Sequence, residues 1–203
     1  MPAGRPAPSG HSPLRRRLLF CGLALAATDV AAEPDRTAGA AGDPPVFVRR
    51  VLPDAALAGE WRLRFFGLRI YDARLWVGRR FEADNFGAYP LALELTYHRA
   101  FAGADIAKRS IEEIGHQGGL TPGQALRWRT ELAGLLPDVQ PGDRLTGLYR
   151  PGRGMTVWQG SRQLGSIEDA ELALRFFGIW LSPRTSEPAL RSALLARLTE
   201  ARP

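Results

Sequence analysis

The hydrophobic period of this chain changes from two to three or four and back again, and this order constrains the fold more than any other feature. A period of two is typical of strands, whose side chains alternate between two faces. It predicts strands over residues 60–66, 68–77, 91–98, 144–150, 155–159 and 163–167. Gly67 marks the turn between the first two, and Pro151-Gly152-Arg153-Gly154 forms a later hairpin turn. The last three strands therefore form a meander.

Helical spacing predicts two pairs of helices. The first pair follows residue 98: Ile106 to Ile114 recur at helical spacing, and a second helix begins at Thr121-Pro122 and stops at Pro137. The second pair follows residue 167, with one helix over 169–180 and a last one capped by Ser186. Residues 81–90 are predicted to be a loop. Three strands, two helices, three strands and two helices form an α+β pattern, whereas a doubly wound α/β fold would alternate.

The length and composition indicate one folded domain. The chain has 203 residues, 45% of them hydrophobic and 24% charged, which is ordinary for a globular protein. We find no internal repeat and no long linker after residue 45. The domain is therefore assigned to residues 46–200.

The first 32 residues have the features of a signal peptide. Arg15-Arg16-Arg17 precede an apolar run, Leu18 to Ala27, and small residues follow at Val30-Ala31-Ala32. The run is about half as long as a membrane-spanning helix. We therefore expect cleavage near Ala32 and export to the periplasm, with residues 33–45 as a flexible lead-in. Paired arginines also leave a twin-arginine signal open.

Charge and cysteine usage exclude several classes of function. Of the 27 Lys and Arg residues, four lie in the first 32 residues together with one of the 21 acids, so the remaining chain carries only +3. No nucleic-acid motif accompanies that charge, and no nucleic-acid partner is expected. The single cysteine, Cys21, lies in the leader and follows bulky Phe20, which disfavours lipidation; residues 33–203 can form no disulfide.

From about Leu57 to Leu195 the order of segments resembles the chalcone isomerase-like family, in its bacterial exported branch. The resemblance rests on several blocks of sequence in the right order. They are Gly67-Leu68-Arg69-Ile70-Tyr71-Asp72-Ala73-Arg74-Leu75-Trp76, Leu93-Glu94-Leu95-Thr96-Tyr97-His98-Arg99, Pro137-Asp138-Val139, Gly142-Asp143, Gly165-Ser166-Ile167 and Ile179-Trp180-Leu181-Ser182-Pro183.

The resemblance implies an open-faced β-sandwich: an antiparallel sheet with helices packed on one side and a ligand cleft between helices and sheet. Plant members of the family cyclise chalcones, and related plant members bind fatty acids instead. The catalytic set of the plant enzymes is poorly matched. Arg62 matches the catalytic arginine of the plant enzymes only with a register slip, and Tyr71 falls near the position of their strand threonine. The positions of their helix lysine and asparagine fall near Asp105 and Arg109.

The residues expected to line the cleft are Arg62, Tyr71, Tyr97, Arg99, Ser110 and Trp128. An arginine among aromatic walls suits a carboxylate that carries an apolar tail. The alternative is structural: the aromatic residues lie in the core, and the arginines are surface charges or partners of Glu94 or Glu113. His98 and His116 lie on different elements and lack the spacing of a metal site, so neither metal nor cofactor is predicted.

These observations lead to three hypotheses. The first is an exported, non-catalytic protein that binds a small amphiphile such as a fatty acid. The second is an isomerase or intramolecular lyase with an unknown substrate. The third is a module that binds a protein partner.

Overall fold

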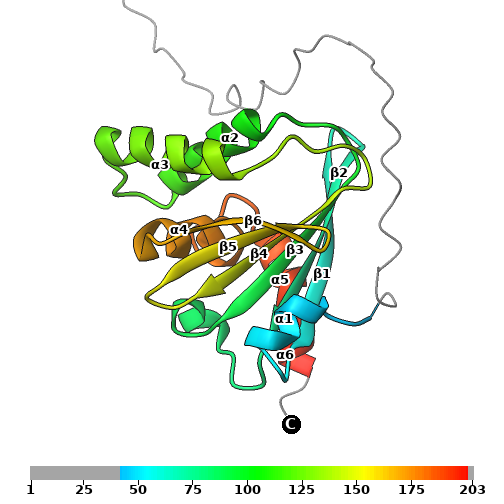
Figure 1. Ribbon diagram of the computed structural model, residues 1–203. Coiled ribbons are helices and arrows are strands. Elements are labelled where there is room, and N and C mark those ends of the chain that lie inside the picture. The colour runs from blue at the N-terminus through cyan, green and yellow to red at the C-terminus, as the bar shows by residue number, and fades with distance from the viewer. Residues whose placement is uncertain (1–41, 201–203) are drawn as a thin grey trace, which may run out of the picture. The chain divides into compact units, whose positions relative to one another are not determined.

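The computed structural model describes residues 42–200 (Figure 1). The predicted signal peptide, residues 1–32, and most of the predicted lead-in lie outside the described residues.

A single antiparallel sheet forms the centre of the described part of the chain. Its strands are β1 (Ala56–Phe65), β2 (Leu68–Val77), β3 (Leu91–Tyr97), β4 (Arg144–Arg150), β5 (Gly154–Gln159) and β6 (Arg162–Ile167). They lie in the sheet in chain order, β1-β2-β3-β4-β5-β6. The predicted strands are thus confirmed, and β3 and β4 pair although two helices separate them in sequence.

The helices are α1 (Val46–Val51), α2 (Gly103–His116), α3 (Pro122–Leu135), α4 (Ala170–Leu181), α5 (Pro188–Leu194) and α6 (Ala196–Glu200), with a 3-10 helix η1 (Ala83–Ala88). The four helices α2 to α5 contribute to one core with the sheet. We call this face of the sheet the inner face. Figure 1 shows α2 and α3 side by side, with α4 between them and the lower end of the sheet. This is the predicted α+β, open-faced arrangement.

The alternation of β3 explains how the inner core forms. Leu91, Leu93, Leu95 and Tyr97 all point to the inner face and are buried. The facing helices supply fully buried side chains such as Leu132 of α3. Burial of this apolar area is the main source of stability in a domain without disulfides.

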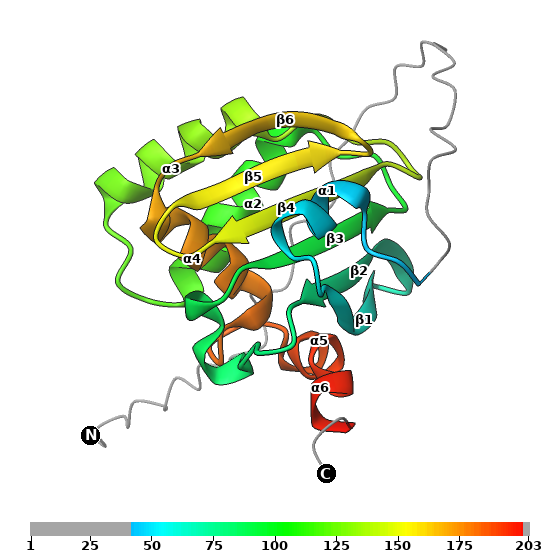
Figure 2. The same cartoon turned by 60° about the horizontal axis from the view of Figure 1, so that its bottom comes forward.

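The opposite, outer face carries a helix that the sequence analysis did not predict. Val48 and Leu52, at α1 and its end, pack on Trp76, Ala92 and Leu148 of the sheet. Phe47 stacks on Trp158, with 4.2 Å between ring centroids. Figure 2 looks onto this face, with α1 in front of the sheet. Helices therefore cover the inner face extensively and the outer face in one place.

Beside α1, the outer face buries a charged group. Glu94 is only 2% exposed. Arg74 and Arg144, on the two neighbouring strands, each lie 3.8 Å from a carboxylate oxygen of Glu94. Burial raises the pKa of Glu94, and the two arginines oppose that shift.

The predicted helix boundaries are confirmed at α3 and corrected at α5. Thr121 accepts a hydrogen bond from the backbone N–H of Gln124 and forms a capping box with it. The predicted Ser186 cap is wrong: Glu187 occupies the N-cap of α5, and Ser186 donates a hydrogen bond of 2.6 Å to Glu113. The predicted loop 81–90 contains η1.

The turn between β1 and β2 has an unusual residue. Phe66 has φ of 47° and Gly67 has φ of 77°, and positive φ at both central positions is typical of a type I′ hairpin turn. Glycine adopts this conformation freely, whereas a side chain such as Phe costs about 1–2 kcal/mol there.

Candidate functional site

Tyr71 is a partly buried residue of β2 that packs against the inner core. Its hydroxyl accepts a hydrogen bond of 3.0 Å from the indole N–H of Trp180, in the last turn of α4. Burial strongly raises the pKa of Tyr71, while the bond from Trp180 lowers it by less. The phenol is therefore protonated at neutral pH and has a proton to donate.

Tyr97 forms an aromatic wall beside it. Tyr97 lies directly opposite Tyr71 in the β2–β3 register, and their ring centroids are 6.0 Å apart. Phe101 continues the wall, 5.9 Å from Tyr97. Burial also raises the pKa of Tyr97, so both phenols are neutral.

Charged groups from α2 and α5 surround the Tyr71 phenol. Glu113 is buried, accepts a hydrogen bond from the Ser186 hydroxyl and forms an ion pair with Arg109, one turn earlier on α2. The charges of Glu187 and Glu113 raise the pKa of Tyr71, and that of Arg109 lowers it. This corner thus combines a phenol, a carboxylate and an indole N–H.

A hollow of about 480 Å³ adjoins this corner at the edge strand β1. We call it the β1 hollow; it is lined by Trp61, Arg62, Leu63, Arg64 and Glu187. Leu63 lies directly opposite Tyr71 in the β1–β2 register, so the hollow backs onto the buried phenol. Its volume lies within the roughly 300–1,000 Å³ typical of small-molecule sites.

The two arginines of the β1 hollow differ in their partners. Arg62 binds Asp72 through two nitrogens, at 2.6 and 3.0 Å, and His98 lies 2.9 Å from the same carboxylate. The bond from Arg62 is the main reason why the pKa of Asp72 is lowered. Within residues 42–200 the Arg64 guanidinium makes no ion pair, so it is available to an anion.

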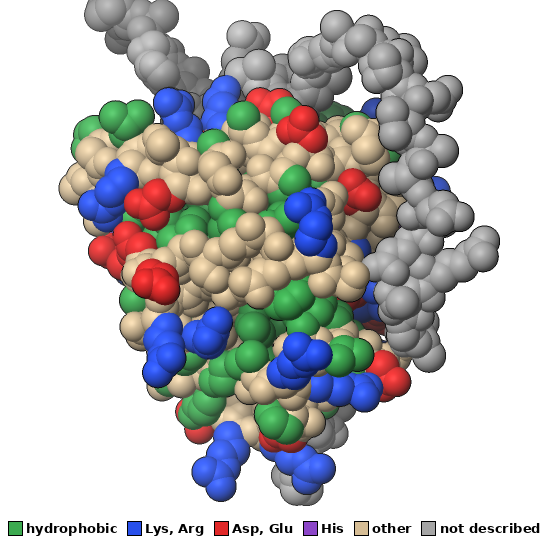
Figure 3. All heavy atoms as spheres, viewed as in Figure 1, with side chains coloured by type: hydrophobic (Ala, Val, Ile, Leu, Met, Phe, Trp, Pro, Cys, Tyr) green, Lys and Arg blue, Asp and Glu red, His purple; other side chains and the backbone are tan. Residues whose placement is uncertain are grey.

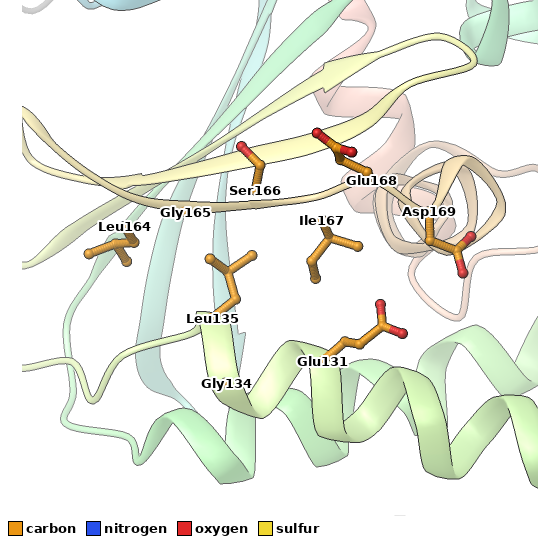
Figure 4. A pocket seen from close by; sticks show the side chains of 9 residues that line it. All are labelled: Glu131, Gly134, Leu135, Leu164, Gly165, Ser166, Ile167, Glu168 and Asp169. Carbon is orange, nitrogen blue, oxygen red and sulfur yellow. The ribbon is translucent and has the colours of Figure 1, made fainter.

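A second hollow, of about 580 Å³, lies between α3 and the other edge strand, β6; we call it the β6 hollow. Leu135 and Ile167 point into it from opposite sides, and Glu131 and Asp169 lie at one end (Figure 4). Figure 3 shows the hydrophobic band between the upper helices and the sheet, with acidic side chains at its left end. Arg127 forms ion pairs with both of these carboxylates, at 3.6 Å from Glu131 and 3.2 Å from Asp169.

The structure brings some of the predicted site residues together and separates others. Tyr71 and Tyr97 are neighbours, and Arg62 lines the hollow behind Tyr71. Ser110 is buried on α2 and donates its hydroxyl to the carbonyl of Ile106. Arg99 is exposed after the end of β3.

Trp128 lies in the core, as the alternative reading held. It is fully buried, and its indole N–H donates a 2.9 Å hydrogen bond to Asp169, the N-cap of α4. Trp128 therefore links α3 to the first turn of α4, whereas the contact of Tyr71 is with Trp180 in the last turn of α4.

Sequence reasoning missed Trp61, Arg64, Glu113 and Trp180 as site residues. Arg64 had a detectable signal, because a second arginine follows Arg62 in the same predicted strand. Trp180 had none, because it fitted the apolar stripe of its helix. Its contact with Tyr71 joins residues 109 positions apart.

No helix within residues 42–200 is long and apolar enough to cross a membrane. The same residues contain no group of three or more His, Cys, Asp or Glu side chains that could hold a metal ion.

The six-stranded antiparallel sheet with helices packed on its inner face is an α+β arrangement of the chalcone isomerase type. A solved structure of a fatty-acid binding protein from Arabidopsis thaliana is similar, with a TM-score of 0.54 at 13% identity, covering 71% of this chain and 88% of that one. At this identity the likeness concerns the fold alone.

The chain belongs to the chalcone isomerase-like family, whose model matches residues 92–196. It is also 32% identical over 108 residues to an uncharacterized protein of Haemophilus influenzae. That match covers 53% of this chain and 52% of the relative, so the chain spans about half of the relative's length.

Proposed function

We propose that this protein is exported and binds, without catalysis, a small amphiphile with a carboxylate head, such as a fatty acid, in the β1 hollow. The observation that carries the proposal is the Arg64 guanidinium, which has no ion-pair partner within the described residues and lines the hollow together with Trp61 and Leu63. A bound carboxylate would satisfy it with charge-assisted hydrogen bonds.

The walls of the β1 hollow suit the rest of such a ligand. Trp61, 39% exposed, and Leu63 supply apolar surface next to the arginines. A hydrocarbon tail that covers these side chains removes apolar area from water, which favours binding by about 25 cal/mol per Å². The tail then points toward Leu63 and the Tyr71–Tyr97 wall.

Charge distinguishes the two hollows as binding sites. The β1 hollow carries Arg64, which has no ion-pair partner within the described residues, whereas Glu131 and Asp169 of the β6 hollow are paired with Arg127. A carboxylate head group therefore finds an unpaired cation in the β1 hollow, whereas the β6 hollow offers it carboxylates, two of them already paired.

Isothermal titration calorimetry on the delipidated chain tests this proposal, with dodecanoate and dodecylamine as probes. We expect dodecanoate to bind and dodecylamine, which has a cationic head, to bind much more weakly. Arg64→Gln should weaken dodecanoate binding by about tenfold, because a charge-assisted hydrogen bond is worth roughly 1.5–3 kcal/mol. Trp61→Ala should also weaken it.

Matched controls come from the exposed face of α3. Arg129→Gln removes an exposed arginine and Leu126→Ala an exposed apolar side chain, 61% exposed, away from the hollow. Both should bind dodecanoate like the unchanged chain. The proposal fails if neither probe binds, or if Arg64→Gln and Arg129→Gln have the same affinity.

The Tyr71 phenol favours a second candidate function, an isomerase or intramolecular lyase. A buried, neutral phenol that is held in place by Trp180 is suited to donate a hydrogen bond to a developing enolate. If a substrate screen finds turnover, Tyr71→Phe should abolish most of it. Turnover that survives this substitution unchanged excludes the role of Tyr71.

A further inference from the structure

The tip of the β1–β2 hairpin exposes apolar and cationic side chains together. We define the hairpin tip as residues 64–69, Arg64-Phe65-Phe66-Gly67-Leu68-Arg69. Phe66 is 76% exposed and Leu68 is 49% exposed. The tip also stands clear of the sheet, because β3 pairs only with residues 71–77 of β2. The turn lies at the upper right end of the sheet in Figure 1.

Two features of the hairpin tip oppose folding. Phe66 takes a left-handed conformation, with φ of 47°, at a position where Asn or Gly is favoured. Arg64 lies directly opposite Arg69 in the β1–β2 register, and like charges facing each other across strands are destabilising. Within residues 42–200 neither arginine has an ion-pair partner. Departures from local rules of this kind are expected at functional sites.

We propose that the hairpin tip docks onto an anionic lipid bilayer. Phe66 and Leu68 enter the interfacial region, where aromatic and apolar side chains partition favourably, while Arg64 and Arg69 lie at the phosphate level. The bilayer brings negative charge between the two opposed arginines and relieves their repulsion.

Size and charge favour a bilayer over a protein partner. A stable protein interface needs about 800 Å² from each partner, which far exceeds what a two-residue turn and its flanks present. A fluid surface, in contrast, accepts a small protruding wedge with cations around it. The proposal does not depend on a ligand in the β1 hollow, although Arg64 belongs to both the hairpin tip and the lining of that hollow.

Co-sedimentation with vesicles tests the docking. The full chain is mixed with vesicles of phosphatidylcholine and phosphatidylglycerol in equal parts, and separately with phosphatidylcholine alone. We expect binding to the anionic vesicles that falls as salt is raised, because screening weakens attraction to the surface. The double variant Phe66→Asn with Leu68→Asn should reduce the partition coefficient at least tenfold, since both apolar contacts are lost. Arg69→Gln should reduce it about fivefold.

The variants are chosen so that misfolding cannot imitate the result. Asn suits the left-handed turn position, so Phe66→Asn does not disturb the hairpin. Leu126→Asn with Arg129→Gln, on exposed α3, is the matched control and should bind as the unchanged chain does. All variants share residues 1–41, so differences between them report the tip. Equal binding by tip and control variants would overturn the proposal, as would sedimentation showing that the tip holds two copies of the chain together.

Discussion

At the scale of single residues, Phe66 and Glu94 each occupy a position that works against stability. Phe66 takes positive φ in an exposed turn, and Glu94 holds a carboxylate in the outer face of the sheet at 2% exposure. Neither side chain adds apolar contacts to the core, because Phe66 is 76% exposed in the turn and Glu94 is a buried polar group in the outer face. Each therefore leads to a measurable effect on stability.

Replacing Phe66 with Asn should stabilise the protein. Relief of the left-handed strain is worth about 1–2 kcal/mol. The variant also loses the edge-to-face contact with Phe65, whose ring centroid lies 4.6 Å from that of Phe66, and this loss offsets part of the gain. Urea unfolding should show a net gain of about 0.5 kcal/mol or more. Gly67→Ala, at φ of 77°, is the reverse test and should destabilise. A loss of stability in Phe66→Asn would contradict the turn conformation.

Replacing Glu94 with Gln should change how stability depends on pH. The folded-state pKa of Glu94 is raised above its ordinary value of 4.5, so the folded state binds the proton more tightly than the unfolded state. The stability that comes from this tighter proton binding is fully present at low pH and is lost as pH rises from 4.5 through the folded-state pKa of Glu94.

Urea unfolding at a series of pH values measures this effect. The stability of Glu94→Gln relative to the unchanged chain should rise as pH increases above 4.5, because the variant has no carboxyl to ionise there. A difference that stays constant over that range, or falls, would show that folding does not raise the pKa of Glu94.

At the scale of the elements, local signals set most boundaries. The Thr121-Pro122 start of α3 was predictable because a cap residue and a first-turn proline act within four residues of each other. Helix α1 was not: a six-residue helix has too few turns to display a period. Its apolar residues have a role only once Trp76 and Trp158 form a surface for them.

The capping box predicts a specific loss. Thr121→Ala removes the acceptor for the backbone N–H of Gln124 and should lower the free energy of unfolding by about 1 kcal/mol. Thr130→Ala, in the exposed middle of the same helix, is the matched control and should change it by less than about 0.5 kcal/mol. Thermal or urea unfolding distinguishes the two. Equal effects would mean that the cap does not stabilise α3.

At the scale of the whole molecule, the fold was predictable from sequence and the site was predictable only in part. The periods gave the order of strands and helices, and β-sheet neighbours such as Tyr71 and Tyr97 came from strands already recognised. The partners of these residues came from far along the chain. Ser186 reaches Glu113 across 73 positions, and no local pattern links them. In the same way, the sequence does not reveal that the Trp128 indole is bonded to Asp169, 41 positions away.

The proposed site for a carboxylate amphiphile is formed by two elements that are far apart in the sequence. The edge strand β1 supplies Arg64 and the apolar wall, and α5 closes the hollow with Glu187. Because Gly59 lies under the backbone of Ala193 and Leu194, β1 and α5 are held in close contact. The hollow is thus formed before the ligand arrives, which lowers the entropic cost of binding.

Native mass spectrometry of the protein purified without delipidation from its producing cells tests this binding most directly. We predict one amphiphile with a carboxylate head per chain, which is lost in Arg64→Gln and retained in Arg129→Gln. A protein that carries no such molecule, or one that retains it equally in both variants, would contradict binding in the β1 hollow.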